Sequence, residues 1–468
     1  MSLWIQWWSL IKQLRPACTR KKTFLWMAAA IAAMSVRSDL AGVTSIVRAL
    51  GLKSSCYERL LGMFHSNSLK LEELTTLWVR LVFKCSSGLL QLNGRYVLVG
   101  DGVKVAKSGK KMPAVKRLHQ ESESNTKPEF IMGHSIQAVS ILAQGLSSVF
   151  AIPLSARIHE GLVFNNNDKR TLLDKMVLLL KSLPMEKHPY YFVADAYYAA
   201  RKIILGLLKE GHHLISRVRK TAVAYETPSA VEGKKKRGRP RKYGKKIKLI
   251  ELFDQEESMK EEISPVYNEK GVKIKIASYD LLWKNVGILV RFVVVIHPSR
   301  GRILLMSTDR TLPALQILKL YGLRFKIELS FKQAVHVIGT YGYHFWMRQM
   351  KPLKRNSGNQ YLHKTNQTYR DGIRRKMRAY HVHIQLGVIS QGVLQLLSIS
   401  APDLVWTSFG SWIRTIRPGL CPSENVTSIA LRNTLANFLG KSPSDVELVS
   451  FIQERLDLER IEGTRLAA

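Results

Sequence analysis

The sequence predicts a mixed α/β protein with helical regions at both ends of the chain. Three observations lead to this fold class. Residues 1 to about 92 carry apolar side chains at helical spacing, three short β-branched runs follow from Tyr96, and helix-like and strand-like segments then alternate. Because 468 residues are too many for one ordinary hydrophobic core, we expect several domains.

The central segments explain why a sheet is expected. Three strands are predicted at "YVLVGDGVKV", "HSIQAVSILA" and "SVFAIPLSARI", each apolar, rich in β-branched residues and bounded by Gly or Ser. An amphipathic helix at "KRTLLDKMVLLLKSL", a strand at "YYFVADAYYA", a helix at "RKIILGLLKEG" and a strand at "HHLISRVRK" come next. Strands followed by alternating helices and strands favour a mixed sheet.

The regular pattern ends at Thr221 and resumes only near residue 300. Residues 234–248 hold ten basic residues and no acid, so no core can form there. Beyond them, "VKIKIASYDLLW" and "VGILVRFVVVIH" are typical of strands, and "GRILLMSTD" predicts a strand that returns to the main sheet. The predicted division is a helical region at 1–92, an α/β domain in two parts at 93–221 and 300–346, a β-rich insertion at 222–299 and a helical region at 347–468.

Charge indicates the class of partner. Seventy-two Lys and Arg against 35 Asp and Glu give a formal charge of +37, although 46% hydrophobic residues are typical of a globular protein. A polyanion would neutralise such an excess of positive charge, and we favour nucleic acid over a membrane as the partner. The apolar run from Phe24 to Met34 is too short to span a bilayer and is interpreted as a core helix. Four scattered cysteines suit a reducing compartment, and no phosphate-binding glycine motif predicts a nucleotide cofactor.

Two aspartates follow buried strands. Asp101 comes after "VLVG" and Asp195 after "FVA", so each carboxylate is expected at a strand end, where ligand sites of open α/β sheets are found. Taken singly, either one is more often a turn former or a helix cap.

A further group of polar residues lies in "LYGLRFKIELSFKQ". Tyr321, Arg324, Glu328 and Lys332 are spaced by 3, 4 and 4 residues, so they form one stripe on a helix. A solvated face with Arg324–Glu328 and Glu328–Lys332 ion pairs would show the same spacing. The flanking residues are nearly all apolar, which instead suggests a helix that is buried on most sides and carries Glu328 towards Asp101 and Asp195.

Three carboxylates brought together predict a metal centre. They would repel one another unless divalent cations lay between them, and oxygen ligands without His or Cys select Mg²⁺ or Mn²⁺. Two such ions can assist the cleavage of a phosphodiester. Arg324 and Lys332 would then place positive charge on the scissile phosphate, and Tyr321 would offer a hydrogen bond or a stacking face.

Together these residues resemble a known family. An aspartate after the first strand, an aspartate after the fourth, an insertion and then a helix with Tyr-x2-Arg-x3-Glu are similar to insertion-sequence transposases of the DDE superfamily, in the branch with a Tyr-Arg-Glu-Lys signature. The resemblance covers roughly residues 90 to 346 and includes "GDGVKVAKSGKKMPAVKRLHQES" and "ADAYYA". It implies a ribonuclease-H-like core, with two-metal cleavage and strand transfer at Asp101, Asp195 and Glu328; the nearest lysine after the glutamate is Lys332.

Several basic segments are candidates for DNA contact. Arg237-Gly238-Arg239-Pro240 resembles an AT-hook, although a localisation signal or a solubilising run would look alike. Tyr341, Tyr343, Phe345 and Trp346 precede a basic stretch and could line a DNA channel or a domain interface. Residues 44–64 have the layout of a helix-turn-helix or of two bundle helices. The predicted DNA-binding residues are Lys104, Arg237, Arg239, Arg241, Lys242, Lys351, Arg355, Arg374 and Arg375.

The resulting hypothesis is a DNA transposase that uses two Mg²⁺ or Mn²⁺ ions, acts on double-stranded DNA as a homodimer and resides in the cytoplasm with the nucleoid. Two alternatives stay open. One is a DNA-binding derivative of the fold that has lost catalysis, and the other is a two-metal endonuclease that cuts DNA without joining a 3′-hydroxyl to new DNA.

Overall fold

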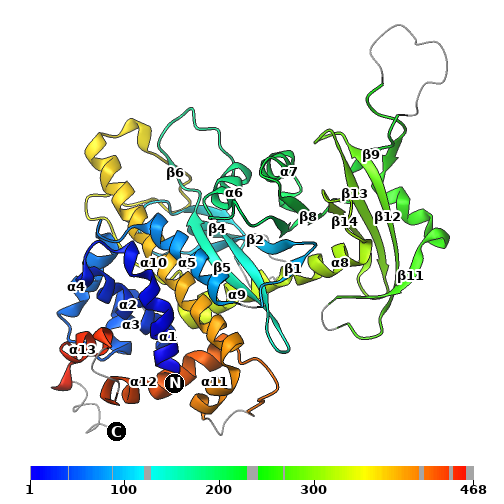
Figure 1. The fold of residues 1–468 in the computed structure, drawn as a ribbon. Helices are drawn as coiled ribbons and strands as arrows, with labels where there is room; N and C mark the ends of the chain where they lie inside the picture. The colour runs from blue at the N-terminus through cyan, green and yellow to red at the C-terminus, as the bar shows by residue number, and fades with distance from the viewer. Residues whose placement is uncertain are drawn as a thin grey trace.

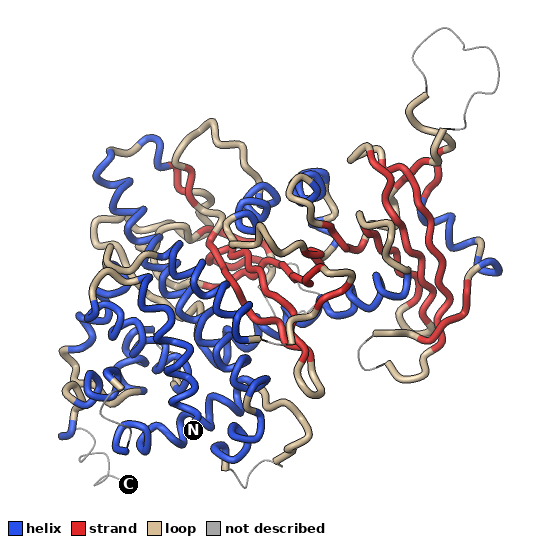
Figure 2. Tube along the Cα trace, viewed as in Figure 1, coloured by secondary structure: helices blue, strands red, loops and turns tan. Residues whose placement is uncertain are grey.

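A computed structural model places a large twisted sheet between a helical body and a protruding β-rich arm (Figure 1). The structure describes residues 2–40, 42–86, 88–120, 128–228, 241–266, 269–410, 416–441 and 446–459. Figure 2 shows the separation plainly, with helices gathered at one end of the molecule and long strands at the other.

The helical body is built from both ends of the chain. Its N-terminal elements are α1 (Leu3–Ile11), the 3₁₀ turn Lys12–Ala17, α2 (Lys21–Val36), α3 (Gly42–Ala49), α4 (Cys56–His65) and α5 (Leu71–Cys85), and its C-terminal elements are α10 (Gln367–Ser400), α11 (Pro402–Phe409), α12 (Glu424–Lys441) and α13 (Glu447–Gln453). The long helix α10 contacts α1, α2, α4, α5 and α12, so the two ends of the chain share one core. Ser35 and Ser390 meet at 3.0 Å between their hydroxyl oxygens, and Trp4 stacks on Phe438 with ring centroids 4.9 Å apart.

Five strands form the centre of the sheet. They are β2 (Arg95–Ala106), β4 (Phe130–Gln144), β5 (Val149–Ile158), β7 (Tyr190–Ala194) and β8 (His213–Arg217). The spatial order is β8-β7-β2-β4-β5, with β2, β4 and β5 antiparallel and β7 and β8 parallel to β2. This mixed sheet with helical flanks is consistent with a ribonuclease-H-like core, so the predicted fold class is confirmed. The short strands β1 (Gln91–Leu92), β3 (Lys116–His119), β6 (Leu162–Val163) and β15 (Gln360–Tyr361) complete this part of the fold.

Helices cover both faces of the central strands. Because side chains alternate along a strand, Leu98 and Phe192 face α6 (Leu172–Lys181) and α7 (Arg201–Leu208), in the larger hydrophobic core. Val99 and Val193 belong to a second core on the opposite face, which contains apolar residues of α8 (Ala314–Gly322) and α9 (Lys326–Gln333). The second core therefore fixes α8 and α9 beside the same strands that carry the two aspartates.

The β-rich arm continues the sheet. It contains β9 (Val223–Tyr225), β10 (Lys246–Lys248), two 3₁₀ turns (Leu249–Asp254 and Glu256–Ser258), β11 (Lys260–Ile263), β12 (Lys273–Trp283), β13 (Ile288–His297) and β14 (Gly301–Ser307). The strand β14 pairs with both β13 and β8, as the sequence predicts for a strand returning to the main sheet. The arm strands and the central strands thus form one hydrogen-bonded sheet.

The segment from residue 320 to 333 differs from its prediction. A single helix was expected, but α8 ends at Gly322, the 3₁₀ turn Leu323–Phe325 follows, and α9 begins at Lys326. The break coincides with Gly322, where an added Cβ would lie 3.1 Å from Val266 of the arm. Most of α9 is buried or half-buried as expected, but Glu328, Leu329 and Lys332 form an exposed face, and the buried cation is Lys326.

One helix among the described residues is long and apolar enough to cross a membrane, namely α10. Its most apolar window is 94% buried inside the protein, as expected for a core helix. The apolar run predicted to be a core helix, Phe24 to Met34, lies in α2 and is buried throughout.

The contact between α5 and α10 gives a test of the shared helical core. A Cβ at Gly392 would lie 2.2 Å from the ring of Trp78, which is fully buried. We expect Gly392→Ala to destabilise the protein by about 1–3 kcal/mol, because the ring cannot move without disturbing its neighbours. Thermal denaturation followed by circular dichroism measures the loss.

The matched control is Gly440→Ala on α12, where an added Cβ meets no atom within 4 Å. This variant should be unchanged or more stable by roughly 0.5–1 kcal/mol. Equal melting temperatures for Gly392→Ala and wild type would show that α5 and α10 do not pack as described.

Candidate active site

The pairing of β2 with β7 places Asp101 and Asp195 level with each other. The two strands are parallel, and the paired positions run from Tyr96 with Tyr190 to Val99 with Val193, a constant difference of 94. Asp101 and Asp195 differ by the same 94 positions (195 − 101). Neighbouring strands lie about 4.8 Å apart, so the two aspartates begin from adjacent points of the backbone.

Side-chain alternation points both carboxylates to one face. Asp101 is two residues beyond Val99, and Asp195 is two residues beyond Val193, on the face covered by α8 and α9. Asp195 directly follows β7 and accepts a hydrogen bond from the Tyr197 backbone N–H at 3.1 Å. The expectation that Asp101 ends its strand is wrong, because β2 continues to Ala106 in its pairing with β4. Its pairing with β7, however, ends at Val99, which leaves that side of Asp101 open.

Arg324 joins the sheet to α9. Its guanidinium donates from Nη1 to Oδ2 of Asp101 at 3.2 Å and from Nη2 to Oε1 of Glu328 at 2.5 Å. The side chains of Arg324 and Asp101 are 19% and 21% exposed, while that of Glu328 is 55% exposed. The structure therefore brings Asp101, Arg324 and Glu328 together, from positions more than 200 residues apart in the sequence.

The electrostatics of Asp101 link it to the other acids. The pKa of Asp101 is raised to about 6, chiefly by burial and also by the carboxylates of Asp195 and Glu328, although the Gly102 backbone N–H and Arg324 act to lower it. Burial also raises the pKa of Tyr321, which lies near both Arg324 and Asp195. The five groups thus act on one another electrostatically.

The remaining predicted polar residue, Lys332, follows Glu328 by one helical turn on α9. It is exposed on α9 and has no ion-pair partner within 4 Å among the residues that the structure describes. Of the two ion pairs expected along the stripe, Arg324–Glu328 is present and Glu328–Lys332 is absent from the described pairs.

The chemistry of these donors fits a hard divalent cation. Asp101, Asp195 and Glu328 offer only oxygen ligands, which suit Mg²⁺ or Mn²⁺. Within the described ranges, no group of three or more His, Cys, Asp or Glu side chains is arranged to hold a metal ion, since Arg324 takes the place between Asp101 and Glu328. The guanidinium would have to leave one carboxylate before the three could share a cation.

Comparison with known families agrees with this arrangement. A family model described as DDE superfamily endonuclease matches residues 13–275, which is more than half of the chain. The protein belongs to this family. The match includes Asp101 and Asp195 and ends before Glu328. A search of curated proteins finds no match.

A DDE superfamily endonuclease is an enzyme that acts on DNA, so the positions of the predicted DNA-binding residues matter. Lys104 lies exposed on β2, Lys351 and Arg355 are exposed after α9, and Arg374 and Arg375 are exposed on α10. Arg241 and Lys242 lie beside the arm, whereas Arg237 and Arg239 fall outside the described residues. These assignments stay predictions.

The aromatic cluster divides into two groups. Tyr341, Tyr343 and Phe345 are at most 5% exposed and belong to the main hydrophobic core, which supports the interface alternative for these three rings. Trp346 is 66% exposed.

A buried cation near this cluster was missed in the sequence. Lys107, six residues beyond Asp101, donates from Nζ to the backbone oxygens of Tyr341 and Tyr343 and lies 3.8 Å from the centroid of the Tyr343 ring. Burial lowers the pKa of Lys107 to about 7. A lysine among several in "KVAKSGKK" gives no signal that one of them is buried.

A second set of buried polar groups, from β4, β8 and the segment after β7, lies near the aspartates. Tyr198, which is 2% exposed, accepts a hydrogen bond from Nε2 of Gln137 at 3.1 Å, and burial together with Asp101 and Asp195 raises its pKa. On the neighbouring strand β8, Ser216 donates from Oγ to the backbone oxygen of Asp195 at 2.7 Å. These contacts fix the backbone at the end of β7.

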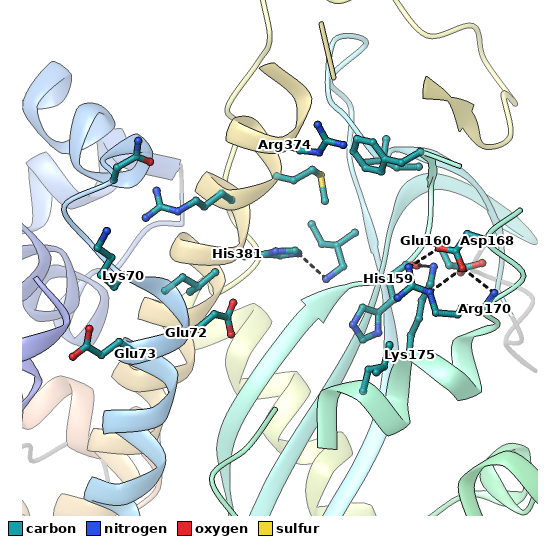
Figure 3. A pocket seen from close by; sticks show the side chains of 18 residues that line it. Lys70, Glu72, Glu73, His159, Glu160, Asp168, Arg170, Lys175, Arg374 and His381 are labelled. Atoms are coloured by element: carbon teal, nitrogen blue, oxygen red, sulfur yellow. Dashed lines mark hydrogen bonds and ion pairs between the residues drawn. The ribbon is translucent and has the colours of Figure 1, made fainter. Parts of the chain in front are cut away.

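A pocket of about 810 Å³ lies between α10 and the segment that follows β5 (Figure 3). Helix α10 and the start of α5 form one wall, and His159, Glu160, Asp168, Arg170 and Lys175 form the other. None of the three carboxylates lines it. His159 is connected to the site, because its Nδ1 donates to Oε1 of Gln137 at 2.6 Å, and Gln137 in turn contacts Tyr198.

The raised pKa of Asp101 predicts a pH dependence of stability. Below pH 3.8 the carboxyl group is protonated in both the unfolded and the folded chain, and above about pH 6 it is charged in both. The cost of burying the charge is therefore absent at low pH and fully present above pH 6. In a buffer with a metal chelator, Asp101→Asn should be more stable than wild type at pH 8 by up to about 3 kcal/mol.

This stability difference should shrink as the pH falls from 6 to 4. Chemical denaturation of both proteins at several pH values measures it. A difference that does not change with pH would mean that Asp101 has an ordinary pKa, and hence that its carboxyl group is not buried beside Asp195 and Glu328.

Proposed function

We propose that this endonuclease is a DNA transposase of the branch with the Tyr-Arg-Glu-Lys signature, and that it cuts transposon ends and transfers the resulting 3′-hydroxyl into target DNA. The observation that supports this proposal most is the bridge of Arg324 between Asp101 and Glu328, on the face to which Asp195 also points. The bridge joins the first acid of the DDE pattern to the third.

In this proposal Asp101, Asp195 and Glu328 hold the divalent cations. Two bound Mg²⁺ or Mn²⁺ ions supply Lewis acidity at the attacking and leaving oxygens of a phosphodiester. The protein side chains supply position and charge. Arg324 exchanges a carboxylate partner for the scissile phosphate, and the hydroxyl of Tyr321, which lies near Arg324 and Asp195, donates a hydrogen bond to the same phosphate.

Strand transfer uses the same groups. The 3′-hydroxyl oxygen forms a bond to the target phosphorus, the bond from that phosphorus to its 3′-oxygen breaks, and the released 3′-oxygen takes up a proton. Because the attacking oxygen, the phosphorus and the leaving oxygen must lie in line, the transposon strand and the target DNA strand both have to lie at the three carboxylates. In this proposal Lys332, which is exposed on α9, contacts DNA beside the site rather than the reacting phosphate.

The other parts of the chain are assigned by the same proposal. Residues 1–92 and 347–468 bind DNA and mediate self-association as a homodimer, residues 93–221 and 300–346 form the catalytic domain, and residues 222–299 form an insertion that carries the basic loop. Acting on DNA, the protein would reside in the cytoplasm with the nucleoid.

The proposed roles of the three acids can be tested separately. Asp101→Asn, Asp195→Asn and Glu328→Gln should each abolish Mg²⁺-dependent cleavage of DNA carrying the transposon end and leave DNA binding within about twofold, because the changes remove ligands without adding bulk. Gel analysis of cleaved strands and a binding titration measure the two effects. Glu454→Gln, an exposed glutamate at the end of α13, is the matched control and should cut normally.

Normal cleavage by any one of the three variants would remove that residue from the site. The products also separate the two kinds of nuclease. Joining of the 3′-end to a second DNA molecule identifies a transposase, whereas cut ends that are never joined identify an endonuclease without strand transfer.

A second prediction concerns the basic loop. Replacing Arg237, Arg239 and Arg241 with Ala should weaken DNA binding broadly and reduce the slope of log affinity against log salt by about 0.9 for each lost phosphate contact. Titrations at several salt concentrations measure the slope. The matched control replaces Lys181, Lys187 and Lys209, three exposed basic residues at or near the C-terminal ends of α6 and α7 and outside the proposed DNA-binding regions. Identical slopes for the loop variant and wild type would exclude the loop from DNA contact.

A further inference from the structure

In the segment after α9, buried and exposed side chains alternate, and one of the exposed side chains is a tryptophan. From Tyr341 to Arg348, the side chains of Tyr341, Tyr343, Phe345 and Met347 are buried, and those of His344, Trp346 and Arg348 are exposed. The buried side chains anchor the segment in the core, so Trp346 is held with 66% of its surface in solvent. An indole ring exposed to water gains no hydrophobic stabilisation, so packing of the core does not explain why a tryptophan occupies this position.

Backbone hydrogen bonds hold this segment against the loop that follows β2. The N–H groups of Met347 and Leu353 donate to the backbone oxygens of Lys111 and Lys110 at 3.0 and 2.7 Å, and the Nζ of Lys111 donates to the backbone oxygen of Arg348 at 3.2 Å. Met347 and Met350 pack beneath it against Leu362 and Ile373. The loop also lies close to the indole, since a Cβ at Gly109 would be 3.1 Å from Nε1 of Trp346.

The two segments that meet at the ring are rich in cations. Neither residues 107–117 nor residues 341–365 contain an acidic residue. Among the described pairs, none of the following cations has a carboxylate within 4 Å: Lys110, Lys111, Arg348, Lys351, Lys354 and Arg355. We call this surface, with Trp346 at its centre, the Trp346 platform.

We propose that the Trp346 platform binds an unpaired strand of DNA, with one base stacked on the indole and the neighbouring phosphates held by Lys110, Lys111 and Arg348. Exposed aromatic rings beside cations suit single strands, because each base of a single strand offers a free face. Within a duplex these faces are covered by the adjacent base pairs. The proposal rests on DNA being the substrate of the proposed function.

The platform is close enough to the carboxylates to hold a strand that passes through the site. Gly109 is eight residues beyond Asp101, so the two lie at most about 29 Å apart. With a rise of about 3.4 Å per nucleotide in one strand, this distance corresponds to at most about eight nucleotides of B-form DNA. A strand released by cleavage can therefore reach the indole.

The test compares single-stranded and double-stranded DNA in a buffer with a metal chelator. Fluorescence anisotropy measures the binding of a labelled poly-dT strand and of a blunt duplex of equal length. Trp346→Ala should weaken binding of the single strand by about tenfold and change duplex binding by less than about twofold, because only the single strand stacks on the ring. Trp346→Phe should keep most of the affinity. Leu146→Ala, an equally exposed apolar residue in the turn between β4 and β5, is the surface control.

Two further readouts separate stacking from charge. A 2-aminopurine base in the strand should be quenched on binding to wild type and not to Trp346→Ala. Replacing Lys110, Lys111 and Arg348 with Ala should weaken both forms of DNA and lower the salt slope, which Trp346→Ala should leave unchanged.

Equal loss of single-strand and duplex affinity in Trp346→Ala, or no loss of either, would overturn the proposal. Because binding is measured without metal, this result is independent of cleavage by the carboxylate variants. If Trp346→Ala does not weaken binding of the single strand selectively, the proposed transposase activity is unaffected. If the protein never cuts DNA, binding of a single strand by the Trp346 platform is unaffected.

Discussion

The parallel pairing of β2 with β7 is the constraint on which the candidate site depends. Hydrogen bonds between these strands fix a difference of 94 positions, and a shift by one residue would turn one of the two aspartates to the opposite face. The buried pairs Val97 and Val99, and Tyr191 and Val193, resist such a shift because they fill the core beneath α8 and α9. Apolar packing along the strands therefore sets the positions of charged groups at their ends.

The segment that carries Glu328 is fixed at its far end as well. Arg37, which is buried between α2 and α3, donates to the backbone oxygens of Ile338 and Gly339 at 2.9 Å and to the hydroxyl of Ser45 at 2.8 Å. Gly339 has a positive φ of 66°, so it ends the helical segment in the left-handed conformation. A buried guanidinium next to helix carbonyl groups offsets their partial negative charge. The N-terminal helices thus hold the end of the segment that carries Glu328.

Much of the fold follows from local patterns. The alternating β-branched runs gave the central strands, and the apolar helices at both ends gave the helical body. The predicted strand "YVLVGDGVKV" runs past Asp101, as β2 does, but its pattern does not show that the pairing with β7 ends at Val99. The sequence also could not show that α8 ends at Gly322, or that Gly322 lies close to Val266 of the arm.

Part of the site was also predictable. The Arg324–Glu328 ion pair, which the spacing allowed as part of a solvated helix face, is present. The bridge from Arg324 to Asp101 joins residues more than 200 positions apart in the sequence. Local spacing cannot predict a contact between such distant segments. Trp346 stood in the sequence among three rings that became core, and only the alternation of buried and exposed side chains separates it from them.

The continuous sheet has a mechanical consequence. The arm is joined to the central strands through the hydrogen bonds of β14 with β8, and the hydroxyl of Ser216 on β8 donates a hydrogen bond to the backbone oxygen of Asp195. An arm on a flexible linker could swing without effect on the rest of the molecule. Here a force on the arm, such as tension from bent DNA bound to it, would be transmitted to Asp195 through the backbone hydrogen bonds of β14 with β8 and of β8 with β7.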